Sequence, residues 1–147
     1  MRDSEFIEIV EEYSQPPAIV WRARTDARLL SKWLMPNDFK LAIGHRFTFT
    51  GVPIPAVGFD GIVYCEVLDF EIERRLAISW TDGLHADVDW TVTWTLEPTN
   101  GGTRLRLFHY GFDPNNERHQ VSRRIMSGGW RPALSRLREE CVVLATP

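Results

Sequence analysis

Cysteine is scarce in this chain of 147 residues, which contains Cys65 and Cys141 and no other. Their spacing matches no metal-binding or redox motif, so we expect two free, largely buried thiols and no disulfide framework. Long apolar runs are missing too: no stretch of about 18 apolar residues occurs, and the N-terminal segment lacks the apolar region of a signal peptide. The sequence therefore predicts a cytoplasmic protein without membrane insertion.

An excess of positive charge is also lacking. The formal net charge is -3 and the pI is about 5.8, which gives the chain little long-range attraction for a phosphate backbone. The basic residues are scattered or confined to 22–28, 74–75 and 118–138, where solvated helix faces account for them. We therefore expect no nucleic-acid partner.

Familiar catalytic and cofactor motifs are absent. The chain has no GxSxG, no GxGxxG and no phosphate-binding glycine loop,. Its four histidines belong to different predicted elements and form no ligand-spaced pair,. We therefore expect no metal, no cofactor and no nucleophilic catalysis by the familiar routes. These histidines are His45, His85, His109 and His119.

The residues that are present suit one soluble domain. Hydrophobic residues make up 44% and charged residues 25% of the chain, which is ordinary for a globular protein,. A domain of this length buries about 70% of the surface that its unfolded chain exposes. No repeat, low-complexity tract or linker divides the sequence, so we expect a single domain over 1–147. Six tryptophans are more than such a core usually needs.

The N-terminal part predicts a strand followed by two short helices. Residues 6–13 indicate an edge strand, and the Pro16-Pro17 pair begins a helix that runs to about Arg24,. Thr25 or Asp26 can cap a second helix, whose apolar residues recur at helical spacing.

The period then changes to that of strands. Phe47 and Phe49 alternate with polar residues, and 51–58 is a loop rich in proline and glycine,. In residues 59–70 both odd-numbered and even-numbered positions carry apolar residues. This segment is either a central strand covered on both faces or a strand with a bulge, and its register stays open.

Two later strands show a clean alternation. In 88–96 the even positions are apolar and the odd ones polar, which predicts one buried face,. In the next strand one parity carries the apolar residues, so His109 is expected to point inward with them. The inward positions are Val88, Trp90, Val92, Trp94 and Leu96, then Thr103, Leu105, Leu107 and His109.

The C-terminal third predicts a helix with an interruption. From Trp130 to Leu144 apolar residues recur at helical spacing,. Gly128, Gly129 and Pro132 fall close together, and an interior proline removes a backbone hydrogen bond. Either a new helix starts near Gly129, or one long helix kinks there.

Several short motifs follow one another in a fixed order over roughly Phe6 to Leu144. They are PPAIVWRARTD (16–26), Lys32-Trp33, IGHRFTF (43–49), Asp60-Gly61, RRLAISW (74–80), GGTRLRLFHYGF (101–112) and GGW (128–130). The ordered set resembles the activator-of-heat-shock-protein-ATPase homologue-like branch of the START-like (SRPBCC) superfamily. The resemblance implies an α+β helix-grip fold, like that of the birch-pollen allergens. In that fold an antiparallel sheet of about six or seven strands wraps around a long C-terminal helix, with a cavity between them.

Aromatic residues supply the candidate walls of such a cavity, because small-molecule pockets are mostly apolar with a few polar groups. The alternative is that these rings simply pack the core. His109 can likewise be a core histidine whose hydrogen bonds are satisfied within the protein, or a polar group that binds the ligand. Tyr64, Glu66, His85 and His109 are the candidate polar groups that would orient a ligand. The predicted ligand-binding residues are Trp33, Phe47, Tyr64, Trp80, Trp90, Trp94, His109, Met126 and Trp130.

Three functions remain open. The first is a binding protein for a small hydrophobic or aromatic molecule. The second is a co-chaperone-like interaction module, which the resemblance to activators of the 90-kDa heat-shock ATPase implies, with a chaperone as partner. The third is a cyclase or aromatase, for which His109, Glu66 and Tyr64 are the acid–base groups to nominate. A homodimer is compatible with each.

Overall fold

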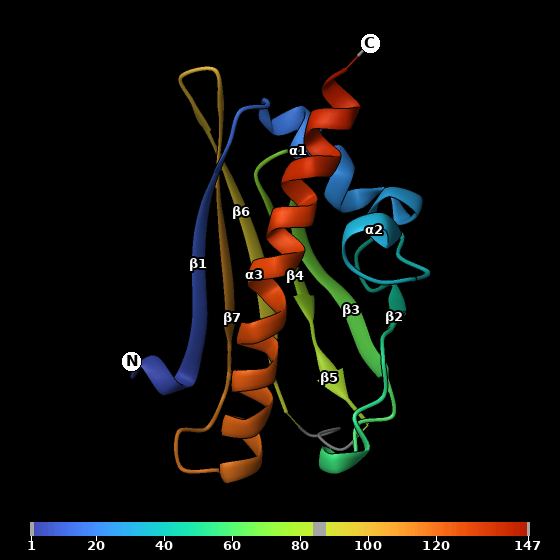
Figure 1. The fold of residues 1–147 in the computed structure, drawn as a ribbon, viewed down its shortest axis with the longest axis vertical. Helices are drawn as coiled ribbons and strands as arrows, with labels where there is room; N and C mark the ends of the chain where they lie inside the picture. The colour runs from blue at the N-terminus through green and yellow to red at the C-terminus, as the bar shows by residue number, and fades with distance from the viewer. Residues whose placement is uncertain (1, 84–87, 147) are drawn as a thin grey trace.

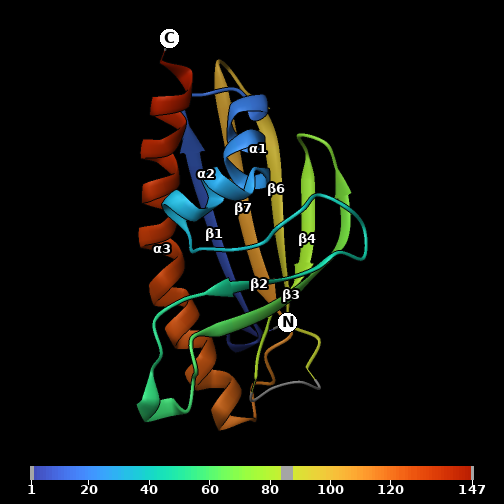
Figure 2. The same ribbon diagram turned by 90° about the vertical axis from the view of Figure 1, so that its right-hand side faces the viewer.

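A sheet of seven antiparallel strands curves around one long helix, α3 (Figures 1 and 2). The computed structural model describes residues 2–83 and 88–146. The strands lie in the order β1-β7-β6-β4-β3-β2, and β5 pairs with β3 beside that path. The elements are η1 (Asp3–Glu5), β1 (Phe6–Tyr13), α1 (Pro17–Thr25), α2 (Ala27–Trp33), β2 (Arg46–Thr50), η2 (Pro55–Val57), β3 (Ile62–Glu71), β4 (Arg75–Ser79), β5 (Thr81–Asp82), β6 (Thr91–Thr99), β7 (Gly102–Tyr110) and α3 (Glu117–Ala145). The predicted α+β helix-grip fold is confirmed.

The N-terminal elements match their sequence signals. β1 is an edge strand that pairs with β7 alone. The proline pair begins α1, and Asp26 rather than Thr25 caps α2: its Oδ1 accepts from the backbone N–H of Arg28 at 3.0 Å and of Leu29 at 3.2 Å,. The hydroxyl of Thr25 instead donates to the carbonyl of Trp21.

A β-bulge in β3 explains why apolar residues occur at both odd- and even-numbered positions of this segment. Val63, Cys65 and Val67 face the core, and the register with β4 shifts between Val67 and Asp69. Beyond the bulge the inward parity changes, as expected when one extra residue is inserted into a strand. The bulge alternative is therefore confirmed.

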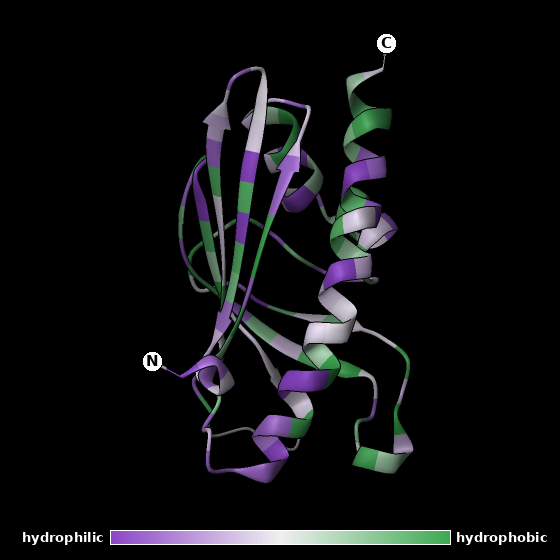
Figure 3. Cartoon of the chain, turned by 60° about the vertical axis from the view of Figure 1, so that its left-hand side comes forward, coloured by the Kyte–Doolittle hydropathy of each residue, from purple (hydrophilic) through white to green (hydrophobic). Residues whose placement is uncertain are grey.

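Strands β6 and β7, which show the alternation, lie in the interior of the sheet. Figure 3 shows hydrophobic and hydrophilic residues alternating along these long strands. Val92 lies opposite His109 and Trp94 opposite Leu107, all of them buried. The predicted strand began at Val88, whereas β6 begins at Thr91. The carbonyl of Trp90 accepts from the backbone N–H of Trp80 instead of joining the ladder to β7.

The C-terminal helix is continuous through the interruption that the sequence signalled. α3 runs across Gly128, Gly129 and Pro132, so of the two alternatives the structure has one long helix and no new helix near Gly129. Because the helix buries its apolar stripe against the sheet on both sides of Pro132, packing compensates for the lost backbone hydrogen bond. The buried residues of α3 are Trp130, Ala133, Leu134, Leu137 and Cys141.

Helices α1 and α2 lie beside the C-terminal half of α3 (Figures 1 and 2). There the hydroxyl of Tyr13 donates to the carbonyl of Leu134 at 3.0 Å, and Nε of Arg136 donates to the carbonyl of Trp33 at 2.9 Å. The N-terminal half of the helix lies opposite the connection between β2 and β3 (Figure 2). The fold thus closes its core at one end of α3 and leaves the other end for a cavity.

Candidate functional site

A cavity of about 860 Å³ lies under the N-terminal half of α3. Its opposite wall comes from the connection between β2 and β3, residues 51–61, which we call the strap, together with β3 and β5. The strap is closed internally: the backbone N–H of Gly51 donates to the carbonyl of Gly61 at 2.6 Å, and Ile54 and Phe59 exchange two backbone hydrogen bonds. One face of the cavity is therefore a small hairpin and the other a helix.

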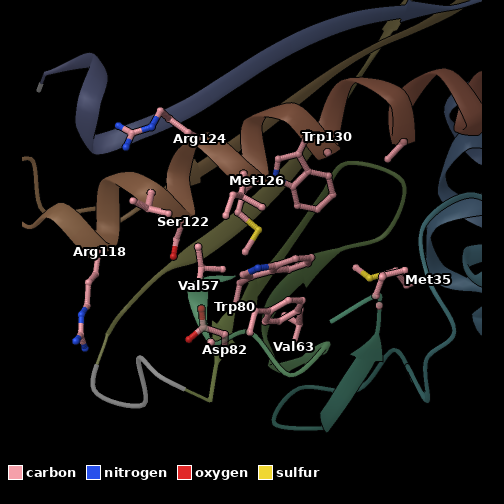
Figure 4. A pocket seen from close by; sticks show the side chains of 18 of the residues that line it. Met35, Val57, Val63, Trp80, Asp82, Arg118, Ser122, Arg124, Met126 and Trp130 are labelled. Atoms are coloured by element: carbon pink, nitrogen blue, oxygen red, sulfur yellow. The ribbon is translucent and has the colours of Figure 1, made fainter. Parts of the chain in front are cut away.

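One end of the cavity is apolar. Figure 4 shows Trp80, Met126, Trp130, Val63 and Met35 gathered there. The rings of Trp80 and Trp130 are 5.0 Å apart between centroids and inclined by 53°. Such walls suit an aromatic or aliphatic occupant.

The other end carries polar groups. Asp82 of β5 is 6% exposed and lines the cavity. Across from it, the hydroxyl of Ser122 is directed from α3 toward the cavity, and Arg118 lies at the margin (Figure 4). The cavity therefore has two chemically different ends.

Exposed apolar side chains surround the opening of the cavity. Val52 of the strap is 81% exposed, and Val57 of the strap and Ile125 of α3 are each 38% exposed. All three also belong to the cavity wall. Apolar surface that continues from the exterior into a cavity is typical of ligand-binding grooves.

Three of the predicted ligand-binding residues lie in the cavity wall, namely Trp80, Met126 and Trp130. Tyr64 lies on the outer face of β3 and is 45% exposed, because its parity is opposite to that of Val63 and Cys65. It therefore does not reach the cavity.

The remaining predicted aromatic residues lie in the core, outside the cavity wall. Trp33 donates from Nε1 to the carbonyl of Ala23 at 2.9 Å, and its ring packs edge-on against Trp94 at 5.8 Å. Phe47 and Trp90 are likewise buried against neighbouring rings. At these four positions the alternative of simple core packing describes the structure.

His109 lies behind the cavity wall. Its Nδ1 accepts a hydrogen bond from Nε1 of Trp130 at 3.1 Å, and both residues are buried. Burial lowers the pKa of His109 from about 6.5 to about 3, so the imidazole is neutral near pH 7,. Its contact with the cavity is therefore indirect, through Trp130.

The three nominated acid–base groups are not brought together. Tyr64 and Glu66 share the outer face of β3, where Oε1 of Glu66 accepts from Nε of Arg46 at 3.3 Å, while His109 is buried on β7. His85, the other candidate polar group, lies outside the described residues. Over residues 2–83 and 88–146, no group of three or more His, Cys, Asp or Glu side chains is placed to hold a metal ion.

Sequence reasoning missed the polar end of the cavity and the strap. Asp82 belongs to a strand of two residues, which is too short for an alternation to reveal. Val57 lies in a segment that the sequence marks only as a loop, and Phe59 begins the segment predicted as a strand, although β3 starts only at Ile62. Ser122 precedes the stripe that begins at Trp130, so the first turns of α3 gave no sign of facing a cavity.

A charged side chain is also buried in the core. Arg24 of α1 is 2% exposed, and its guanidinium lies 4.7 Å from the ring of Trp94 and 5.2 Å from that of Phe39. Its three nitrogens have no hydrogen-bond partner within the described part of the chain. Burial lowers its pKa to about 9,.

The family model described as Activator of Hsp90 ATPase homolog 1-like protein matches residues 14–141. The chain belongs to this family. No curated protein matches it. Among solved structures, the protein MLL2253 from Mesorhizobium loti is 31% identical, with a TM-score of 0.80 over 97% of this chain and 99% of that one.

Solved structures of lower sequence identity share the fold of this chain. CalU16 from Micromonospora echinospora is 27% identical, with a TM-score of 0.71 over 92% of this chain and 75% of that one. Protein NE0264 from Nitrosomonas europaea is 20% identical, with a TM-score of 0.77 over 97% of each chain. At that identity the likeness concerns the fold alone. None of the helices in the described residues has the length and hydropathy of a membrane span.

Proposed function

We propose that the protein binds a small hydrophobic or aromatic molecule in the cavity between the sheet and α3. The observation that carries this proposal is a space of about 860 Å³ against Trp80, Trp130 and Met126. Ligand pockets measure about 300–1,000 Å³ and have mostly apolar walls with a few polar groups. The cavity has the size and lining of such a pocket.

Packing energetics supports an occupant. Protein interiors are close-packed, and voids larger than a water molecule are few. An apolar molecule in this cavity would gain about 25 cal/mol for each Å² of apolar surface removed from water. The buried faces of Trp80 and Trp130 would supply part of that contact.

An apolar fluorescent probe tests this function. We expect the neutral probe N-phenyl-1-naphthylamine to bind saturably at about one molecule per chain and to accept tryptophan emission, because Trp80 and Trp130 lie in the wall,. The native far-UV spectrum and a cooperative unfolding transition would show that the probe reports on the folded state. Absence of saturable binding to folded protein would contradict the proposal.

Family membership supports a second candidate, a co-chaperone-like module that binds a 90-kDa heat-shock ATPase. Such binding would use the outer surface and would not depend on the cavity. Stimulation of that ATPase by the purified protein, unaffected by substitutions in the cavity wall, would favour this candidate over ligand binding.

A further inference from the structure

Trp80 and Asp82 place a hydrogen-bond donor and an acceptor together at the cavity. Trp80 directly precedes β5 and Asp82 belongs to it; both are buried, and both line the cavity. Side chains two positions apart on an extended segment share a face. Nε1 of Trp80 has no hydrogen-bond partner among the residues that the structure describes. The Asp82 carboxylate offers two oxygens with about four acceptor positions, so it can accept a ligand in addition to other bonds.

Ser122 completes this end of the cavity from the opposite wall. Its hydroxyl is directed toward the cavity (Figure 4), and a hydroxyl can donate one hydrogen bond and accept two,. The cavity lining therefore offers a ligand a donor on Trp80 and an acceptor on Asp82 from one wall and a group of either kind on Ser122 from the other.

The charges around the cavity select against ions. Among the described residues, the cavity lining includes the acidic Asp82 and Glu117 and the basic Arg118, Arg124 and Arg136. Because Asp82 is buried, an anionic ligand group beside it would meet a like charge in a medium of low dielectric constant, and a cationic group entering the cavity would meet the charges of the three lining arginines,. A neutral group that both donates and accepts hydrogen bonds avoids either repulsion.

We propose that the ligand is a neutral, apolar molecule with a hydroxyl group, which donates to the carboxylate of Asp82 and accepts from Nε1 of Trp80. Its apolar body then lies against Trp130 and Met126 at the other end of the cavity. This inference rests on the proposed function and adds the chemical class of the ligand. A hydroxyl–carboxylate hydrogen bond is charge-assisted and therefore strong.

Four naphthalene compounds of similar shape test the inference by calorimetry at pH 7. These are naphthalene, 2-naphthol, 2-naphthoate and 2-naphthylmethylammonium. We expect 2-naphthol to bind more tightly than naphthalene by about tenfold or more, and more tightly than either ion. Equal affinities for 2-naphthol and naphthalene, or tightest binding of an ion, would overturn the inference and leave the proposed function standing. If none of the four binds, the proposed function fails as well.

Substitutions at the polar end locate the effect. Asp82→Asn should lower the preference for 2-naphthol over naphthalene by about tenfold and leave the affinity for naphthalene unchanged. The matched control is Asp69→Asn: Asp69 of β3 forms an ion pair with Arg75 at 2.8 Å and lies outside both the strap and the cavity lining. That variant should keep the full preference, and a full preference in Asp82→Asn would overturn the inference.

If Asp82→Asn does not fold, Trp80→Phe tests the same inference by removing the hydrogen-bond donor instead of the acceptor. It keeps an aromatic ring in the wall and removes the N–H that lacks a partner. We expect it to bind naphthalene and to lose several-fold of the preference for 2-naphthol. An undiminished preference in this variant would contradict the assigned role of Nε1.

Discussion

Nε1 of Trp130 donates a hydrogen bond to Nδ1 of His109 over 3.1 Å, which links the wall of the cavity to β7 behind it. Because Nδ1 accepts, the neutral imidazole carries its proton on Nε2. Nε2 has no partner within the described part of the chain. The hydrogen bond fixes the orientation of the Trp130 ring, so His109 influences the cavity through its neighbour.

A double-mutant cycle tests this relationship. We expect Trp130→Phe and His109→Phe each to lower the free energy of unfolding by about 1–3 kcal/mol, because each leaves a buried polar group without its partner. The double variant should lose less than the sum of the two, since neither group then remains. Urea denaturation gives the three values, and strictly additive losses would show that the hydrogen bond contributes no coupling.

The pH dependence of stability follows from the buried imidazole. The folded pKa of His109 is about 3, below its usual value near 6.5, so only the unfolded chain takes up this proton between those values,. The contribution is complete above pH 6.5 and declines by about 1.4 kcal/mol for each pH unit below it. The stability of the wild type minus that of His109→Phe should therefore fall from pH 6.5 to pH 4. A constant difference would mean that the folded and unfolded chains take up this proton equally, so that folding does not lower the pKa of His109.

The periodicity of apolar residues in the sequence predicts the fold, but it does not predict the cavity. Alternation in 88–96 and the stripe from Trp130 to Leu144 specify which faces are buried, because that information is local to each element. Whether a buried ring meets another ring or an open space depends on elements distant in sequence. Trp94 and Trp130 show the same inward pattern, yet Trp94 is covered by Trp33 of α2 and Trp130 borders the cavity.

The polar end of the cavity was beyond sequence reasoning for a related reason. Asp82 and Ser122 are common residue types in unremarkable local patterns, and only the approach of β5 to the start of α3 brings them to one space. The hydrogen bond between His109 and Trp130 likewise joins two elements whose relative position no periodicity reveals.

Replacing Arg24 by methionine should stabilise the protein. The buried guanidinium contacts the rings of Trp94 and Phe39 and, among the described residues, has no hydrogen-bond partner. Removing an unpaired charge from the core while keeping an unbranched chain should raise the free energy of unfolding by about 1 kcal/mol or more. Because the folded pKa of Arg24 is about 9, the advantage of Arg24→Met should shrink above that pH,. Loss of stability in Arg24→Met at pH 7 would contradict this account.

The base of the strap requires a glycine at position 61. Gly61 has a φ of +92°, and a Cβ there would lie 2.9 Å from the carbonyl oxygen of Gly51 and 3.3 Å from Pro53. Gly101 has a similar φ of +86° with nothing within 4 Å, so it is the matched control. Both alanine variants pay about 1–2 kcal/mol for the left-handed backbone. Gly61→Ala should cost more in thermal or urea unfolding and should also weaken probe binding, whereas equal effects would mean that the strap tolerates displacement.

Neighbouring glycines on α3 allow the most direct test of the cavity as a binding site. Gly129 lines the cavity and Gly128 does not, and a Cβ at either position meets no atom within 4 Å. We therefore expect Gly129→Phe to fill the cavity and Gly128→Phe to leave it open, with both variants folded. Measured by titration with an apolar fluorescent probe, binding should be lost or weakened at least about tenfold in Gly129→Phe and kept in Gly128→Phe. Undiminished probe binding by folded Gly129→Phe would contradict the claim that this cavity is the ligand site.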